Sequence, residues 1–208
     1  MRIGILGAGG MAEALGAGWA KAGHDIVVGA RHAGRAADLA ARLGARAGTL
    51  ADAAEHGETV LAALPHTAMN DVITSLADLL AGRALIDCSN PIAPGPDGLV
   101  LTTDGGPSAA RRIAAAAPGA HVVKAFNLCA AGVWAAHTEG LAVPLCGDDA
   151  NALTLVRTLV TDLRAVPLDA GGLDRAGYLE ATAAFVIGVW FAGGDPRTVL
   201  PPLEQSTH

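Results

Sequence analysis

Aromatic and charged residues are scarce in this 208-residue sequence. Phe, Trp and Tyr make up 3% of it, charged residues make up 16%, and the net charge is −6. Binding to nucleic acid or an anionic membrane needs a basic surface, and stacking of bases or sugars needs aromatic side chains. The composition therefore argues against a nucleic-acid partner. With 51% hydrophobic residues, the chain is instead expected to form one globular domain with a sizeable core, with or without a small appendage.

Cysteines and metal-ligand patterns are sparse as well. Cys88, Cys129 and Cys146 are widely spaced and form no C-x-x-C pair, and the seven histidines follow no metal-ligand spacing. Because the first predicted strand begins at Arg2, we expect no signal peptide. An odd number of unpaired cysteines then favours reduced thiols in a cytoplasmic protein. We predict no metal site.

One apolar run, residues 176–194, approaches the length of a membrane-spanning helix. Glu180 and several glycines interrupt it, and its continuously apolar part, residues 181–194, is too short for an unaided span. We therefore expect no membrane partner, and a helix that is buried or lies at an interface.

Predicted strands and helices alternate along the whole sequence. Hydrophobic runs predict strands near residues 2–6, 25–29, 59–64, 84–88, 121–125, 143–146 and 165–169. Helices are predicted near residues 10–22, 34–43, 67–81, 108–117, 130–136, 149–162 and 173–191, with a fainter strand at 45–47 and a short helix at 50–56. This alternation is typical of a doubly wound, Rossmann-type α/β fold with a mainly parallel sheet. We expect a Rossmann domain at 1–170 and a short C-terminal helical extension at 171–208 that is not an independent domain.

The one long gap between predicted elements spans residues 89–107. It begins where a strand ends, at the edge of the sheet where open α/β folds bind ligands. We interpret it as a functional or mobile loop, with a tolerated surface insertion as the alternative.

A glycine motif follows the first predicted strand directly. Residues 7–12 have the sequence GAGGMA and fit G-x-G-x-x-A, the fingerprint of dinucleotide-binding domains. Gly7 permits the tight turn, Gly9 lets the backbone approach a pyrophosphate, and Ala12 keeps the helix close to the sheet. We expect the free N–H groups of this segment, including those of Gly10 and Met11, to hold the diphosphate.

The second predicted strand ends without an acidic residue. NAD-binding domains place Asp or Glu there to bind the ribose 2′-hydroxyl, and such a carboxylate repels a 2′-phosphate. Here the chain has Arg31 and His32, with Arg35 one helical turn further on. Two guanidinium groups form a permanently charged, bidentate phosphate receptor, to which a protonated His32 can add, so we predict NADP(H) as the cofactor. The alternative is that both arginines are solvated surface charges.

Three further predicted strands lead into residues that should line the same crevice. These candidates are Leu64, Pro65, His66, Asn90, Pro91 and Asn127. The prolines offer rigid apolar walls, and the asparagines offer amides to the nicotinamide carboxamide or to the incoming ring. His66 and Asn127 are the candidate catalytic residues, with His66 as proton donor if the substrate is a carbonyl or imine. Turns and helix caps are the alternative roles for the prolines and asparagines.

Two charged positions are expected to be structural. The alternation along residues 122–126 does not decide which face Lys124 occupies, and we expect it in an ion pair rather than as a catalytic base. Asp148 or Asp149 should cap the helix predicted at 149–162.

The sequence resembles the coenzyme F420-dependent NADP oxidoreductases over roughly residues 1–190. The resemblance is carried by MRIGILGAGGMAEALG, IVVGAR, LIDCSNPI, HVVKAFN, PLCGDD and VPLDAGGL, in this order. It implies reversible hydride transfer between NADP(H) and the deazaflavin coenzyme F420 as co-substrate. Similar NADPH-binding modules are also the electron-input domains of membrane ferric reductases, so the motifs leave the acceptor open.

Two other functions remain possible. One is an NADPH-dependent reductase of a small ketone, imine or enone, with His66 as the general acid. Larger dehydrogenases with this fingerprint carry a long helical second domain, and since only residues 173–208 follow the last predicted strand, we expect none here. The other is a non-catalytic NADPH-binding sensor or partner module.

The last predicted helix is apolar around more of its circumference than one sheet-facing stripe needs. These positions are Leu179, Ala183, Phe185, Val186, Val189, Trp190 and Phe191. We predict a homodimer through this helix, which would also close the acceptor pocket. The alternative is a helix buried within its own domain.

Overall fold

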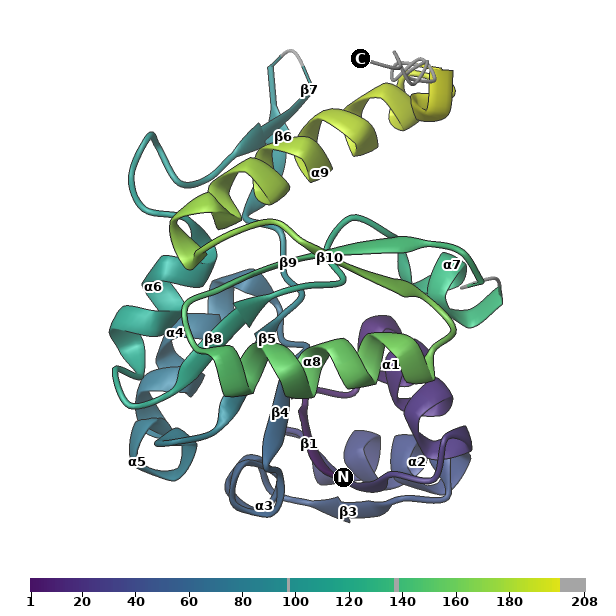
Figure 1. Cartoon of the computed structure of the whole chain (residues 1–208), viewed down its shortest axis with the longest axis vertical. Coiled ribbons are helices and arrows are strands. Elements are labelled where there is room, and N and C mark those ends of the chain that lie inside the picture. Colours follow the sequence, from purple (N-terminus) through teal and green to yellow (C-terminus); the bar gives the residue numbers. More distant parts are fainter. Residues whose placement is uncertain (97, 137–138, 199–208) are drawn as a thin grey trace, which may run out of the picture.

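The computed structural model describes residues 1–96, 98–136 and 139–198 (Figure 1). The main sheet contains β1 (Arg2–Leu6), β2 (Asp25–Gly29), β3 (Arg46–Gly48), β4 (Thr59–Ala62), β5 (Ala84–Asp87), β8 (His121–Lys124), β9 (Ala142–Gly147) and β10 (Val166–Asp169). The helices are α1 (Gly10–Lys21), α2 (Ala33–Leu43), α3 (Leu50–His56), α4 (His66–Ser75), α5 (Ala77–Leu80), α6 (Ala109–Ala116), α7 (Ala131–Ala136), α8 (Ala150–Asp162) and α9 (Ala176–Phe191). Of the predicted extension 171–208, residues 199–208 lie outside the described residues.

The strand order of the main sheet is β10-β9-β8-β5-β4-β1-β2-β3. All neighbouring strands are parallel except β8 and β9, so that β9 and β10 run against the other six strands. The chain leaves β1 toward β2 and β3, and later returns to place β4 on the other side of β1. Between β1 and β4 lies the point where a doubly wound sheet opens a ligand crevice at the carboxyl ends of its strands. The predicted fold class, a mainly parallel Rossmann-type α/β fold, is confirmed.

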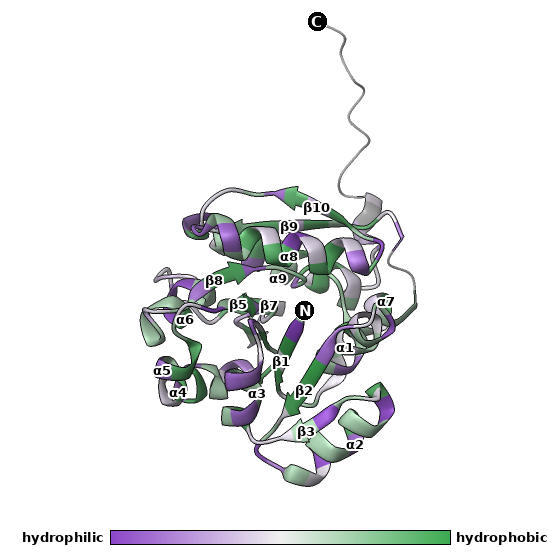
Figure 2. Ribbon diagram, turned by 60° about the horizontal axis from the view of Figure 1, so that its bottom comes forward, coloured by the Kyte–Doolittle hydropathy of each residue, from purple (hydrophilic) through white to green (hydrophobic). Residues whose placement is uncertain are grey.

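Each face of the sheet has its own hydrophobic core. Alternating strand residues divide between the two cores: Ile3 and Ile5 pack beneath α1, α2 and α8, whereas Val60 and Leu85 pack beneath α3 to α6. In Figure 2, strands such as β1, β2 and β8 are coloured as hydrophobic, whereas the surrounding helices mix hydrophobic and hydrophilic residues.

Two element predictions need correction. The gap at residues 89–107 contains an antiparallel hairpin, β6 (Ile92–Gly95) and β7 (Gly98–Leu101), in which Ile92 pairs with Leu101. A proline within a run is a signal against a strand, but Pro94 is tolerated because this hairpin is a separate two-stranded sheet with two edges. The single helix predicted at residues 67–81 is divided at Leu76 into α4 and α5.

Beyond β10, a 3-10 turn (Leu173–Arg175) leads into α9, which packs against α6 and β7. Figure 1 shows α9 and the hairpin lying together on the side of β9 and β10 opposite α8. The first half of α9 is anchored, with Glu180 1% exposed and Ala183 1% exposed. Further along, Phe185, Trp190 and Phe191 are 56%, 63% and 72% exposed. An apolar face of this helix is therefore open to solvent in the single chain.

Lys124 lies in a fully buried ion cluster. Its Nζ is 2.8 Å from Asp87 Oδ2 and 3.0 Å from Glu180 Oε1, and it donates to the Ser89 carbonyl at 2.6 Å. Burial by itself lowers the pKa of this ammonium, but the two carboxylates outweigh it, so that the pKa of Lys124 is raised and the group stays charged. The prediction of a structural ion pair is confirmed.

The predicted helix cap is also found. Asp149 precedes α8 and accepts a hydrogen bond from the Ala152 backbone N–H at 2.7 Å.

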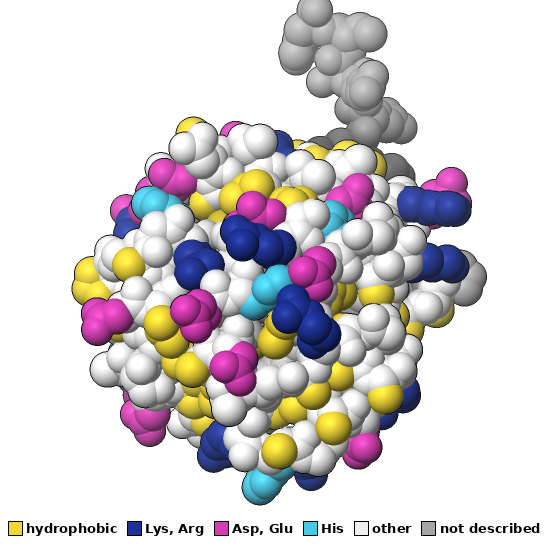
Figure 3. Space-filling model, turned by 90° about the horizontal axis from the view of Figure 1, so that it is seen from below, with side chains coloured by type: hydrophobic (Ala, Val, Ile, Leu, Met, Phe, Trp, Pro, Cys, Tyr) yellow, Lys and Arg dark blue, Asp and Glu magenta, His cyan; other side chains and the backbone are white. Residues whose placement is uncertain are grey.

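Charges on the surface are mixed in sign. On the face seen in Figure 3, basic and acidic side chains are interspersed, without a continuous basic area. Arg46 and Asp25 form one exposed ion pair of this kind. Within the described residues, no helix is both long enough and apolar enough to cross a membrane.

Candidate functional site

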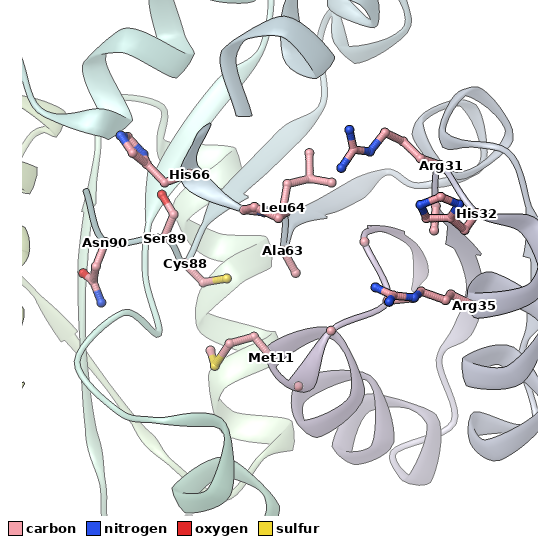
Figure 4. A pocket seen from close by; sticks show the side chains of 16 residues that line it. Met11, Arg31, His32, Arg35, Ala63, Leu64, His66, Cys88, Ser89 and Asn90 are labelled. Carbon is pink, nitrogen blue, oxygen red and sulfur yellow. The ribbon is translucent and has the colours of Figure 1, made fainter. Parts of the chain in front are cut away.

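A cavity of about 420 Å³ lies at the carboxyl ends of β1, β2, β4 and β5, where the sheet order reverses (Figure 4). Its lining comprises residues 7–11, residues 30–32 with Arg35, residues 63–66 and residues 88–90. Four segments that are distant in sequence meet here because the carboxyl ends of neighbouring parallel strands share one edge of the sheet. Eleven of the fourteen predicted site residues line it: Gly7, Gly9, Gly10, Met11, Arg31, His32, Arg35, Leu64, Pro65, His66 and Asn90.

The floor of the cavity is the glycine turn between β1 and α1. Gly7 has φ +117°, and a Cβ on it would lie 2.2 Å from the Ala63 carbonyl oxygen, so no other residue fits there without a shift. A Cβ on Gly9 would meet no atom within 4 Å and would project into open space. Gly9 is also the N-cap of α1 and has no side chain to cap it. The N–H groups of the first helical turn therefore have no acceptor within the helix.

One end of the cavity is cationic. Arg31 from the β2–α2 connection and Arg35 from the first turn of α2 point toward it, with His32 between them in the view of Figure 4. Neither arginine forms an ion pair with a carboxylate in the described part of the chain, whereas Arg42 pairs with Glu13 and Arg46 pairs with Asp25. The residues that line the cavity include no Asp or Glu. This end is thus suited to a multiply charged anion.

The opposite end is neutral and comes from the segment after β5. Cys88, Ser89 and Asn90 line it together with His66. Burial raises the pKa of the Cys88 thiol to about 12, and the neighbouring Asp87 carboxylate adds to this effect. Cys88 therefore stays protonated and is a poor nucleophile or metal ligand. No group of His, Cys, Asp and Glu side chains among the described residues is arranged to hold a metal ion.

His66 begins α4 and connects the cavity with the hairpin. Its Nε2 lies 3.4 Å from Thr102 Oγ1, which follows β7 and donates to the Pro91 carbonyl at 3.1 Å. Its Nδ1 is shielded from solvent and has no hydrogen-bond partner within the described structure.

Three predicted site residues lie outside the lining. Ala12 is fully buried in the first turn of α1 and packs in the core on this face of the sheet. Pro91 is buried at the base of the hairpin, where its carbonyl accepts the Thr102 N–H at 2.7 Å. Asn127 is 5% exposed and pairs with Asn90 from behind the wall.

The lining also contains five residues that were not predicted as site residues: Ala8, Ala30, Ala63, Cys88 and Ser89. Each follows a strand of the parallel sheet directly or by one residue, so the rule that selected Asn90 would also have found them. Small or apolar side chains gave no chemical signal of their own.

Residues 2–91 match the family model described as NADP oxidoreductase, coenzyme F420-dependent. This segment contains every residue that lines the cavity. Over these residues the chain is similar to this family.

Two curated relatives match over longer stretches. Metalloreductase STEAP3 of Rattus norvegicus is 31% identical over 193 residues, which cover 91% of this chain and 38% of the relative. The F420-dependent NADP reductase of Methanocaldococcus jannaschii is 29% identical over 150 residues, which cover 66% of this chain and 64% of the relative. The chain therefore spans less than two thirds of the length of either.

Solved structures agree with the fold over nearly the whole chain. A crystal structure from Arthrobacter sp. FB24, assigned as an F420-dependent NADP-reductase, superposes with a TM-score of 0.82 at 25% identity. The match covers 94% of this chain and 96% of that one. An imine reductase from Pseudomonas sp., with a TM-score of 0.70 at 21% identity, shares the fold over 91% of this chain and 62% of its own.

The glycine turn yields a paired prediction. Gly9→Val should fold, because its side chain enters open space, and should lose NADPH binding, because it fills the path of the pyrophosphate. Gly7→Val should instead be strongly destabilised, since its Cβ has no room and its φ is left-handed. Thermal unfolding and NADPH titration of both variants check this. Normal NADPH affinity in a folded Gly9→Val protein would contradict the assignment of the turn.

Proposed function

We propose that this protein transfers a hydride between NADP(H) and the deazaflavin coenzyme F420. The observation that carries the cofactor assignment is the pair Arg31 and Arg35, which face a cavity without acidic lining and have no carboxylate partner among the described residues. The similarity of residues 2–91 to the F420-dependent NADP oxidoreductase family supports the choice of acceptor.

The residues present fit a dinucleotide phosphate. The first turn of α1 offers backbone N–H groups and the positive end of the helix dipole to the diphosphate, and Gly9 leaves the space that it requires. Arg31 and Arg35 would bind the 2′-phosphate, with His32 beside them. Leu64, Pro65 and Asn90 would contact the nicotinamide half, where the bound cofactor supplies the hydride.

The neutral end of the cavity suits transfer between two stacked rings. Ser89, Asn90 and the protonated Cys88 carry no charge, and a direct hydride step depends on proximity and exclusion of water more than on an acid or base. His66 is the one ionisable side chain at this end besides Cys88. In this proposal it packs against the acceptor or hydrogen-bonds to it.

A second candidate acceptor follows from the relative in Rattus norvegicus. That protein is a metalloreductase, and its similarity extends over 91% of this chain. The alternative is therefore an NADPH-oxidising module whose electrons reach a metal ion through a further carrier.

We also propose that the protein is a homodimer through α9. The exposed side chains of Phe185, Trp190 and Phe191 support this, as does an apolar groove of about 1050 Å³ between α9 and the hairpin. A second copy would remove this surface from water.

Cofactor preference tests the cationic end. Alanine at both Arg31 and Arg35 should weaken NADPH binding by about 100-fold or more, since each charged hydrogen-bonded contact contributes about 1.5–3 kcal/mol, or about 10- to 100-fold in affinity. NADH binding should stay unchanged. Titration of both cofactors measures this, with Arg157→Ala on α8 as the control. Equal affinity of the wild-type protein for NADH and NADPH would refute the assignment.

An acceptor panel tests the reaction. Purified protein with NADPH should reduce F420 faster than a ferric chelate, with or without added flavin, and faster than small ketones and imines, as followed by NADPH absorbance. His66→Ala should retain substantial F420 turnover, whereas loss of a general acid for a carbonyl or imine costs about 10²–10⁴-fold. Turnover of the ferric chelate alone would favour the metalloreductase alternative, and turnover of no acceptor would favour a binding module.

Light scattering behind a size-exclusion column tests the dimer. We expect a dimer mass for the wild type and a folded monomer for Trp190→Glu, because a charge on this face opposes its burial. Leu168→Glu, which changes an exposed leucine on the edge strand β10, is the matched control and should stay dimeric. A monomer mass for the wild-type protein at micromolar concentration would refute the proposed dimer.

A further inference from the structure

Asn127 has no amide hydrogen left for a ligand. Its Nδ2 donates to Asn90 Oδ1 at 2.9 Å and to the Leu179 carbonyl of α9 at 3.1 Å. An asparagine amide has two N–H donors, and both are used inside the protein. Asn127 therefore links α9 to Asn90, which lines the neutral end of the cavity.

The link fixes the orientation of the Asn90 amide. Asn90 Nδ2 donates to the Asn127 carbonyl at 2.8 Å, while its Oδ1 accepts from Asn127 Nδ2. If the Asn90 amide were flipped, its Nδ2 would face Asn127 Nδ2 and its Oδ1 would face the Asn127 carbonyl oxygen. Neither hydrogen bond could then form. In the observed orientation, one N–H and one lone pair of Asn90 remain for a ligand in the cavity. A carboxamide, with one acceptor and one donor group, is complementary to this pair.

The turn that carries Asn127 is held in a strained conformation. Phe126, directly before it, is a buried residue with φ +64°, a region that L-residues with bulky side chains avoid. Its ring makes edge-to-face contacts with Trp19 and Trp134, at centroid distances of 5.9 and 5.4 Å. Trp134 Nε1 also donates to the carbonyls of Phe126 and Cys129. The surrounding aromatic residues thus hold the turn that aims Asn127 at Asn90.

A second connection runs from the next residue of α9, Glu180, to the preceding residue of the wall, Ser89. Glu180 contacts Lys124 Nζ, which donates to the Ser89 carbonyl. Ser89 is further held by Asp87, whose Oδ1 accepts from both its N–H and its hydroxyl. Two successive residues of α9 therefore support two successive residues of the cavity wall.

We propose that Asn127 is a positioning residue that orients the Asn90 amide toward the nicotinamide carboxamide, and that residues 179–180 of α9 are part of this support. This inference rests on the proposed hydride transfer from NADPH. It assigns Asn127 no direct contact with the reactants. Loss of the support should impair alignment at the neutral end while the diphosphate and 2′-phosphate contacts remain.

Two variants of similar shape, Asn127→Leu and Asn127→Asp, test the proposal, with the exposed Asn151→Leu on α8 as the matched control. The first readout is hydrogen exchange in the absence of cofactor. The amides of Ser89 and Ile92 are bonded to Asp87 Oδ1 and the Asn90 carbonyl, so their exchange reports on the wall. We expect exchange about 5- to 10-fold faster in both Asn127 variants and unchanged exchange in the control.

The second readout separates alignment from affinity. The NADPH dissociation constant should rise by less than about threefold, because the diphosphate and 2′-phosphate contacts lie away from the neutral end of the cavity. The single-turnover rate of hydride transfer should fall by about 10- to 100-fold. A fall in the rate without faster wall exchange would mean that Asn127 acts on the reactants directly, and would overturn the proposal. Unchanged rate and exchange would overturn it as well.

Amide hydrogen exchange of the wild-type protein, measured with and without NADPH, tests the link even if the variants fail to fold. Bound NADPH should slow exchange at Ser89 and Ile92, and also in the first two turns of α9, because Asn127 joins them. Slowing confined to the glycine turn would contradict the link. If the wild type binds NADPH but reduces no F420 while the wall exchange responds as expected, the proposed acceptor is wrong and the support by Asn127 stands.

Discussion

The buried ammonium group of Lys124 is the interaction on which the arrangement of the neutral end depends. It brings together Asp87 at the end of β5, Glu180 on α9 and the Ser89 carbonyl of the cavity wall. Two carboxylates against one ammonium leave an excess negative charge, which the N–H groups of Ala109 and Ala110 at the start of α6 offset by donating to Glu180. Removal of one member of such a cluster typically costs about 3–5 kcal/mol, because the other charges stay buried without a partner.

The cavity divides the work of binding between backbone and side chains. Its floor offers backbone N–H groups beside the open space at Gly9, and its cationic end offers exposed guanidinium groups that need no fixed rotamer in the absence of a ligand. The neutral end is different, because Asn90 and Ser89 are held by bonds to other buried groups. If the protein binds NADPH as proposed, affinity and alignment would therefore depend on different residues, as expected where a phosphate anchor and a reacting ring lie at opposite ends of one ligand.

The sequence predicted what local rules determine and missed what depends on distant contacts. The glycine turn, the arginines after β2 and the strands were predictable, because motif spacing and hydrophobic runs report on local backbone and burial. The hairpin was missed because Pro94 is a signal against a strand. Two features depend on residues 37 or more positions apart: the side of the sheet that Lys124 faces, and the pairing of Asn127 with Asn90. Hydrophobic periodicity gives no information about such distant contacts. That is why Asn127 was predicted to contact ligand, although the structure places it behind the wall.

The two halves of α9 use different interactions. Leu179 and Glu180 make directional polar bonds to the support of the cavity wall, and such bonds fix orientation because they weaken steeply when misaligned. Trp190 and Phe191 offer apolar area, whose burial is favourable in almost any geometry. At a rise of about 1.5 Å per residue, Trp190 is about 15 Å along the axis from Glu180, so one rigid helix spans both environments. The part of α9 that reaches the cavity wall is therefore its polar, buried half, and the geometry of the wall is set within a single chain.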